Sequence, residues 1–154
     1  MQSSSLKTLL KGKVVIVGIG NTLRGDDGFG PALIAKLKGK VKAACIDAGS
    51  APENYTGKII KERPETILIV DALHLGKSPG EFEILKKEDI ARMGFSTHDI
   101  SPNMFIEYLE NETQADIYIL GLQPKSVSFG EEMSNSVKSA LTEIADLIKE
   151  ADNA

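Results

Sequence analysis

The chain has 154 residues, a length that suits one domain able to bury its own hydrophobic core. Hydrophobic residues make up 42%, charged residues 26%, and the formal net charge is −4, as in an ordinary globular protein. Because no basic cluster is present, binding to nucleic acid or to an anionic membrane surface is not expected. No apolar run is long enough to cross a bilayer and the start lacks a secretory signal pattern, so we expect a cytoplasmic protein.

The chain starts with a polar segment and then the first strand. We expect residues 1–12 to be an N-terminal extension with at most a helical turn around residues 6–10. The unbroken branched apolar run at residues 14–17 predicts a strand that is buried on both faces. A glycine turn and two adjacent carboxylates follow, and a short helix from Gly30 onward is predicted to cover the sheet.

Two more units of strand, loop and helix come next. Residues 43–47 form the second predicted strand, in which the single cysteine, Cys45, is expected to be a buried filler. A helix through residues 53–62 leads to residues 66–71, the most apolar segment of the chain and the third strand. Three such units in succession favour parallel strands joined by right-handed crossovers.

The pattern changes in the second half of the chain. Residues 81–85 alternate between charged and apolar side chains, which predicts a half-exposed edge strand running antiparallel to the others. A helix from Ser101 through about residue 110, a last strand at residues 116–120 and a long amphipathic helix at residues 131–149 complete the chain. The predicted fold class is therefore α/β. It is a single-domain, three-layer α/β/α sandwich with a five-stranded, mostly parallel sheet.

Binding sites in open parallel sheets form beyond the carboxyl ends of the strands. Four polar candidates lie there or on adjoining loops: Asp27, Asp47, Asp71 and His98. Asp71 closes an apolar strand, where a carboxylate is costly unless a site needs it or a backbone amide satisfies it. Asp47 precedes Ala-Gly-Ser, so a role in the turn and a role in the cleft are equally open. Asp26 is expected to face solvent or to cap the following helix.

Two carboxylates and one imidazole, from Asp27, Asp71 and His98, would make a three-ligand metal site with open positions. The other histidine, His74, is expected at the surface.

A nucleotide site is disfavoured because the glycine turn lacks its third glycine and the two carboxylates would repel phosphate. Neither Gly-x-Ser-x-Gly nor His-Glu-x-x-His occurs. The residues alone therefore indicate a hydrolase that uses a metal or acid/base chemistry.

These residues, in this order and context, resemble the hydrogenase maturation endopeptidases, which process the large subunit of nickel–iron hydrogenases. The family's nickel-contacting carboxylates fall by position on Asp27 and Asp71, and its histidine falls on His98. The first acid is Glu in some members and Asp here, a shorter side chain with the same ligand chemistry. The matches span residues 14–149 and look closest to the hydrogenase-3-type branch: GIGNTLRGDDGFGP, IDAGSAPEN, LIVDA, PGEFEI, STH and LGLQP.

The resemblance implies a phosphorylase/hydrolase-like fold and an endopeptidase that removes a C-terminal extension from the hydrogenase large-subunit precursor after nickel insertion. Nickel would be supplied by the substrate, whose thiolates would complete the coordination. Either Asp27 or Asp71 would be the general base, if one acts on water. Two alternatives stay open. One is a hydrolase carrying its own zinc at the same three residues, and the other is a non-enzymatic nickel chaperone that binds the precursor without cutting it.

Overall fold

A five-stranded sheet forms the centre of the protein in a computed structural model that describes residues 3–91 and 102–152. Its strand order is β2-β1-β3-β5-β4. Four strands are mutually parallel, and β4 pairs antiparallel with β5 at the edge. The predicted mostly parallel sheet with one antiparallel edge strand is therefore confirmed. The strands are β1 (Val14–Ile19), β2 (Ala44–Gly49), β3 (Thr66–Ala72), β4 (Phe82–Leu85) and β5 (Asp116–Leu122).

The position of each strand follows from its sequence pattern. β1 and β3 lie inside the sheet, and every residue of both strands is buried. Strands covered on both faces carry continuous apolar runs, as these two do. β4 is short and only Leu85 in it is fully buried, in agreement with the alternating pattern that predicted an edge strand.

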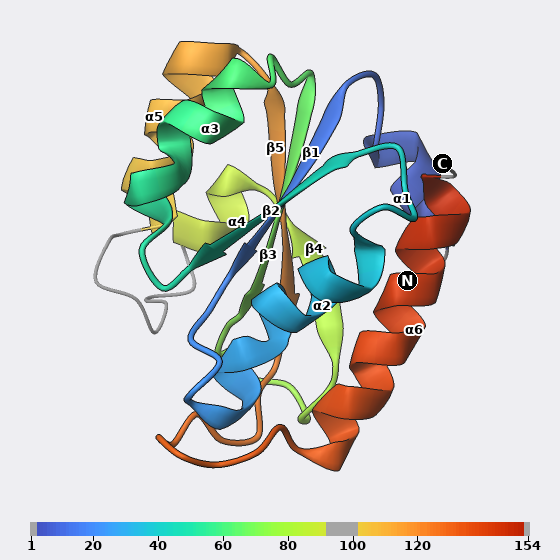
Figure 1. Ribbon diagram of the computed structural model, residues 1–154, viewed down its shortest axis with the longest axis vertical. Coiled ribbons are helices and arrows are strands. Elements are labelled where there is room, and N and C mark those ends of the chain that lie inside the picture. Colours follow the sequence, from blue (N-terminus) through green and yellow to red (C-terminus); the bar gives the residue numbers. More distant parts are fainter. Residues whose placement is uncertain (1–2, 92–101, 153–154) are drawn as a thin grey trace.

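Helices cover both faces of the sheet (Figure 1), which confirms the predicted layers. Short 3-10 helices, η1 (Gly25–Gly28) and η2 (Pro52–Tyr55), precede α2 and α3. Among residues 3–91 and 102–152, no helix has both the length and the apolar character needed to cross a membrane. One face carries α1 (Ser3–Leu9), α2 (Phe29–Leu37) and α6 (Asn135–Ala151), and the other carries α3 (Thr56–Lys61), α4 (Lys87–Ala91) and α5 (Pro102–Thr113).

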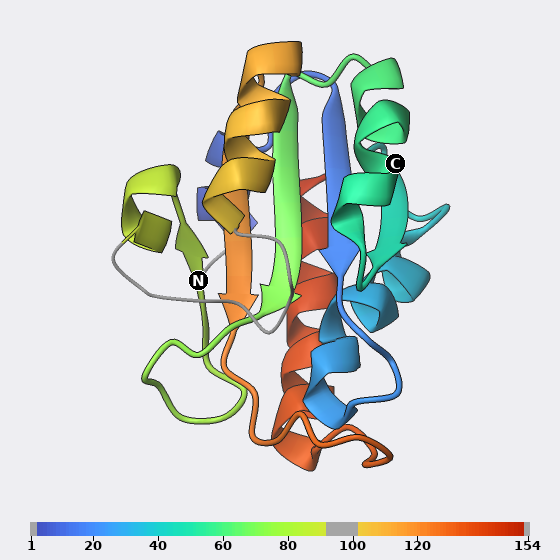
Figure 2. The ribbon, with the colours of Figure 1, turned by 90° about the vertical axis from the view of Figure 1, so that its left-hand side faces the viewer.

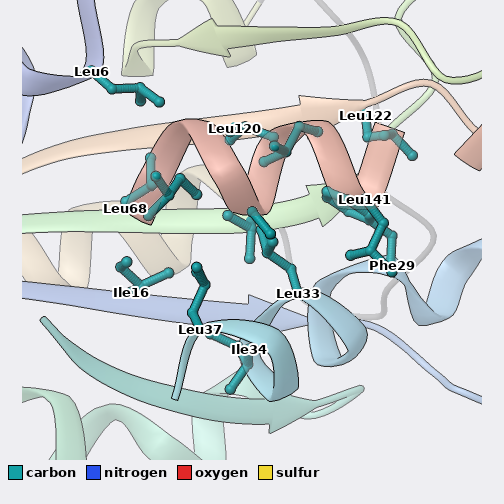
Figure 3. Packing of buried hydrophobic residues seen from close by; sticks show 14 of the residues in the cluster. Leu6, Ile16, Phe29, Leu33, Ile34, Leu37, Leu68, Leu120, Leu122 and Leu141 are labelled. Atoms are coloured by element: carbon teal, nitrogen blue, oxygen red, sulfur yellow. The ribbon is translucent and has the colours of Figure 1, made fainter. Parts of the chain in front are cut away.

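One hydrophobic cluster fills the space between the sheet and the α1–α2–α6 face (Figure 3). Leu33 and Leu37 of α2 are fully buried against the sheet, together with Ile16 of β1 and Leu68 of β3. Leu141 of α6 closes the cluster from the side of the long helix. The second cluster lies on the other face, between the sheet and α3, α4 and α5.

The N-terminal segment belongs to the core, which corrects the expectation of a polar extension. α1 packs against α6, and the side chain of Leu6 is 0% exposed. Leu10 lies four residues later, on the same side of the helical turn, and is also buried. These two leucines are too few to form a clear apolar pattern in the sequence. The packing of α1 against α6 in the folded protein is what shows that the segment belongs to the core.

Two predicted helix boundaries are wrong for local reasons. Residues 53–62 do not form one helix, because the chain first makes η2 and then α3. The last helix begins at Asn135 rather than at Glu131. The residue before it, Ser134, has an extended backbone and donates its N–H to the carboxylate of Asp26 at 2.7 Å. That contact holds the preceding residues in a loop.

The four parallel strands end at one edge of the sheet, and their loops gather there. In Figure 2, β1, β3 and β5 run downward and β4 runs upward. The loop after β1 contains η1, the loop after β3 spans residues 73–81, and the loop after β5 spans residues 123–134. This carboxyl edge is the place where a site is expected in an open parallel sheet.

Candidate active site at the carboxyl edge of the sheet

Glycines allow the turn after β1 to press against the sheet. A Cβ atom on Gly20 would overlap the carbonyl oxygen of Asp27. A Cβ atom on Gly30, at the start of α2, would lie 2.7 Å from the backbone nitrogen of Ile19 and 2.8 Å from the carbonyl oxygen of Val70. The start of α2 therefore touches the ends of β1 and β3, and η1 is held directly at the carboxyl edge.

Asp27 lies in η1 and is 2% exposed. One oxygen of its carboxylate, Oδ2, accepts a hydrogen bond from the backbone N–H of Asn21 at 2.9 Å. The side chain of Asn21 in turn accepts one from the backbone N–H of Leu23 at 2.9 Å. These two bonds close the turn around Asp27 and fix the orientation of its carboxylate.

Asp71 is the second buried carboxylate at this edge, 4% exposed near the end of β3. It pairs in register with Gly121 of β5. Its side chain lines a small cavity of about 30 Å³ whose walls are otherwise apolar, including Phe105 and Ile106 of α5. A carboxylate held among such side chains carries a desolvation cost, which functional sites commonly accept.

The elements that carry Asp27 and Asp71 are in contact. η1 packs against β3, and the adjacent strands β1 and β3 are paired up to Gly18 and Val70. Two buried carboxylates on contacting elements have the oxygen donors that bind a divalent cation, and either one can act as a base toward water. The described residues hold no group of three or more His, Cys, Asp or Glu side chains placed to bind a metal. The third predicted ligand, His98, lies outside the described residues.

Asp47 is placed apart from Asp71. It is exposed, and its Oδ1 accepts a hydrogen bond from the backbone N–H of Gly49 at 2.9 Å, which stabilises the end of β2. Its neighbours Ile46 and Ala48 pack in the cluster on the α3–α5 side of the sheet. Because side chains alternate along a strand, Asp47 projects toward the opposite face, whereas Asp71 lines a cavity against α5. His74 is exposed, as expected.

Asp26 neither faces solvent nor caps the following helix, so both expectations for this residue are wrong. The residue is 1% exposed. Its carboxylate accepts hydrogen bonds from the backbone N–H groups of Lys125 at 2.8 Å and Ser126 at 3.2 Å. The backbone N–H and the hydroxyl of Ser134 also donate to it. These partners follow β5, about a hundred positions away, so the local sequence around Asp26 offered no signal for them.

Gln123 organises the loop that follows Asp71. Its side-chain Oε1 accepts hydrogen bonds from the backbone N–H groups of Leu75 at 2.6 Å and Lys77 at 3.4 Å. Its Nε2 donates to the carbonyl oxygen of Pro124 at 3.0 Å. In the sequence, this residue belongs to the LGLQP motif, and its local pattern indicates no role for it. The structure shows that it ties the loops after β3 and β5 together.

Known proteins resemble this chain in both sequence and fold. The family model HycI, described as hydrogenase maturation protease, matches residues 31–151. The hydrogenase 3 maturation protease of Escherichia coli (strain K12) is 39% identical over 130 residues, which cover 82% of this chain and 83% of that protein.

Solved structures agree with the sequence matches. The crystal structure of the NiFe hydrogenase maturation protease HycI from Thermococcus kodakarensis KOD1 superposes with a TM-score of 0.87 at 35% identity, covering 96% of this chain and 97% of that one. The solution structure of the endopeptidase HycI from Escherichia coli gives 0.81 at 36% identity, covering 90% of each chain. With a family model across most of its length and relatives at this identity, the chain belongs to the hydrogenase maturation protease family, a family of endopeptidases.

Proposed function

We propose that this protein is the endopeptidase that removes the C-terminal extension of a nickel–iron hydrogenase large-subunit precursor. The observation that carries the proposal is the pair of buried carboxylates, Asp27 and Asp71, on contacting elements at the carboxyl edge. Relatives named hydrogenase maturation proteases support the choice of substrate. Hydrolysis of a peptide bond needs a group that takes a proton from water, and a carboxylate serves this purpose.

The donor set supports nickel that arrives with the substrate. Asp27 and Asp71 supply hard oxygen donors, and His98 is the proposed third ligand. Cys45 of β2 is the single cysteine, and its thiol lies 3.7 Å from the carbonyl oxygen of Ala43. Among the described residues, it forms no metal-binding group with these carboxylates. Such a set leaves coordination positions for thiolates of the precursor. Nickel held in this way would polarise the scissile carbonyl or dock the precursor.

Asp71 is better placed than Asp27 to be the general base. It lines a cavity of about 30 Å³, which is large enough to admit one water molecule. The carboxylate of Asp27 is oriented by the N–H of Asn21 at the turn, an arrangement that suits a ligand held in a fixed position. In the proposed reaction, Asp71 accepts a proton from the attacking water. The proton then passes to the leaving amine as the peptide C–N bond breaks, which releases the mature carboxyl terminus and the free tail.

The test is mass spectrometry of a nickel-loaded precursor before and after incubation with the protein. Wild type should shorten the precursor, and Asp27→Asn and Asp71→Asn should each lower the rate at least a hundredfold. Asp47→Asn is the matched control, because it is the same substitution at an exposed carboxylate on the other face, and it should cleave at the wild-type rate. Thermal unfolding of the variants checks that they remain folded.

Three outcomes would contradict the proposal. An intact precursor after incubation with wild type, despite binding, would identify a nickel chaperone instead of a protease. Equal cleavage of precursors with and without nickel would remove nickel recognition from the mechanism. Stoichiometric zinc in the purified protein would favour a hydrolase with its own metal at Asp27, Asp71 and His98.

A further inference from the structure

Two exposed apolar side chains, Leu23 and Phe129, lie on loops at the carboxyl edge. Among the side chains that the structure describes, four large hydrophobic ones are exposed: Leu23 (60%), Met104 (64%), Tyr108 (47%) and Phe129 (72%). Leu23 lies four residues before Asp27, and Phe129 lies in the loop that Asp26 holds. Single exposed apolar residues need no explanation, but two on neighbouring loops beside a site indicate a surface that binds a partner.

Leu23 and Phe129 belong to two loops that are bonded to each other. The backbone N–H of Gly130 donates to the carbonyl oxygen of Leu23 at 2.8 Å. The side-chain Nε of Arg24 donates to the carbonyl oxygen of Val127 at 3.1 Å. Both loops lie beyond the ends of β1 and β5, at the lower end of the molecule in Figure 1. We call the exposed side chains of Leu23 and Phe129, with the loops that carry them, the Leu23/Phe129 patch.

Hydrogen bonds connect the loops of the patch to the candidate site. The N–H of Leu23 donates to Asn21, and the N–H of Asn21 donates to the carboxylate of Asp27. On the other side, the carboxylate of Asp26 accepts hydrogen bonds from the loop that carries Phe129, at both of its ends. Because these loops are already ordered, binding to them has a small entropic cost, and a few buried apolar side chains then supply much of the affinity.

We propose that the Leu23/Phe129 patch docks the folded body of the hydrogenase large-subunit precursor while its C-terminal segment reaches Asp27 and Asp71. This inference rests on the proposed function. The occupant follows from continuity: the scissile bond must approach the two carboxylates, so the body of the same substrate lies against the loops bonded to them. A folded protein has the area to cover both exposed side chains, whereas a short tail segment at the carboxylates leaves them in water.

The test compares two double variants in the full chain. Leu23→Ser with Phe129→Ser removes the apolar surface, and Leu23→Met with Phe129→Leu keeps it. For nickel-loaded precursor, the serine variant should raise KM at least tenfold while kcat stays within twofold of wild type. The conservative variant should remain within threefold of wild type in both constants. Both should unfold at the wild-type temperature, because the substituted side chains are exposed.

Binding in the absence of cleavage separates this inference from the proposed function. The Leu23→Ser and Phe129→Ser substitutions, introduced together into Asp71→Asn protein, should raise the Kd for the precursor at least tenfold. This result is expected whether or not the wild-type protein cleaves the precursor. If wild type fails to cut but this loss of binding persists, the proposed function is wrong and the docking surface stands. An unchanged KM and Kd, or a fall in kcat alone, would overturn the docking surface. The docking surface would also be overturned if free wild-type protein formed a dimer in sedimentation experiments and the two serine substitutions dissociated it. A second copy of the chain would then cover the patch.

Discussion

Asp26 and Ser134 are 108 positions apart in the chain and are joined through both the backbone and the side chain of the serine. The N–H of Ser134 lies 2.7 Å from Oδ1 of Asp26, and its hydroxyl lies 3.0 and 2.8 Å from the two carboxylate oxygens. This contact attaches the residue before α6 to the turn that carries Asp27. The two adjacent aspartates therefore have separate roles. Asp26 binds the loop after β5 to the loop after β1, and Asp27 belongs to the candidate site.

Replacement of Asp26 should destabilise the fold strongly. Asp26→Ala removes the acceptor for the backbone N–H groups of Lys125, Ser126 and Ser134, so we expect a loss of about 3 kcal/mol in the free energy of unfolding. Ser134→Ala removes one hydroxyl donor and keeps the backbone bond, so it should cost about 1 kcal/mol. Urea unfolding followed by circular dichroism measures both. Equal losses for the two variants would show that the carboxylate does not hold the loop.

A methyl group on Gly30 should separate α2 from the sheet. Its Cβ would collide with the backbone of Ile19 and Val70, so Gly30→Ala should cost roughly 3 kcal/mol and lower the cleavage rate by displacing η1. Gly57→Ala is the matched control in another helix, because a Cβ there meets nothing within 4 Å. It should be neutral or stabilise the fold by up to about 1 kcal/mol. Similar unfolding midpoints for the two variants would contradict the close approach of α2.

The N-terminal helix should contribute to stability. Leu6→Ala leaves a cavity where a fully buried side chain packs between α1 and the core, so the free energy of unfolding should fall by about 3 kcal/mol. Lys7→Ala changes an exposed neighbour in the same helix and should stay within about 0.5 kcal/mol of wild type. Chemical denaturation distinguishes the two. A Leu6→Ala variant as stable as wild type would show that α1 is an extension that does not stabilise the core.

The thiol of Cys45 should react slowly. Burial raises its pKa above the ordinary value of 9.0, the nearby charge of Asp152 raises it further, and Lys38 opposes the shift. The thiolate is the reactive form, so iodoacetamide should alkylate the folded protein with a midpoint at higher pH than the urea-unfolded protein. The folded state holds the thiol proton more tightly than the unfolded state does. The resulting stabilisation of the fold is fully present below the ordinary pKa of the unfolded thiol, and it is lost as the pH rises through the raised pKa of the folded thiol. A native midpoint at or below the unfolded one would contradict the shift.

The sheet could be predicted because burial leaves a local pattern in each strand. Val14–Ile19 and Thr66–Ala72 are almost continuously apolar, and both are buried on two faces. The alternation in residues 81–85 likewise identified the antiparallel edge strand. Asp71 was recognisable as a site candidate for the same reason, since a charge in so apolar a strand is costly without a purpose.

Tertiary structure decided what each polar side chain near the edge does. Asp26 looked like a solvent-facing neighbour of Asp27, and Gln123 had no assigned role, because their hydrogen-bond partners lie in distant loops. Leu6 looked peripheral until α6 covered it. Periodicity and composition report which residues avoid water, and these are properties of a segment by itself. A hydrogen bond depends on the positions of two groups, and folding alone brings the loops after β1, β3 and β5 to the same edge.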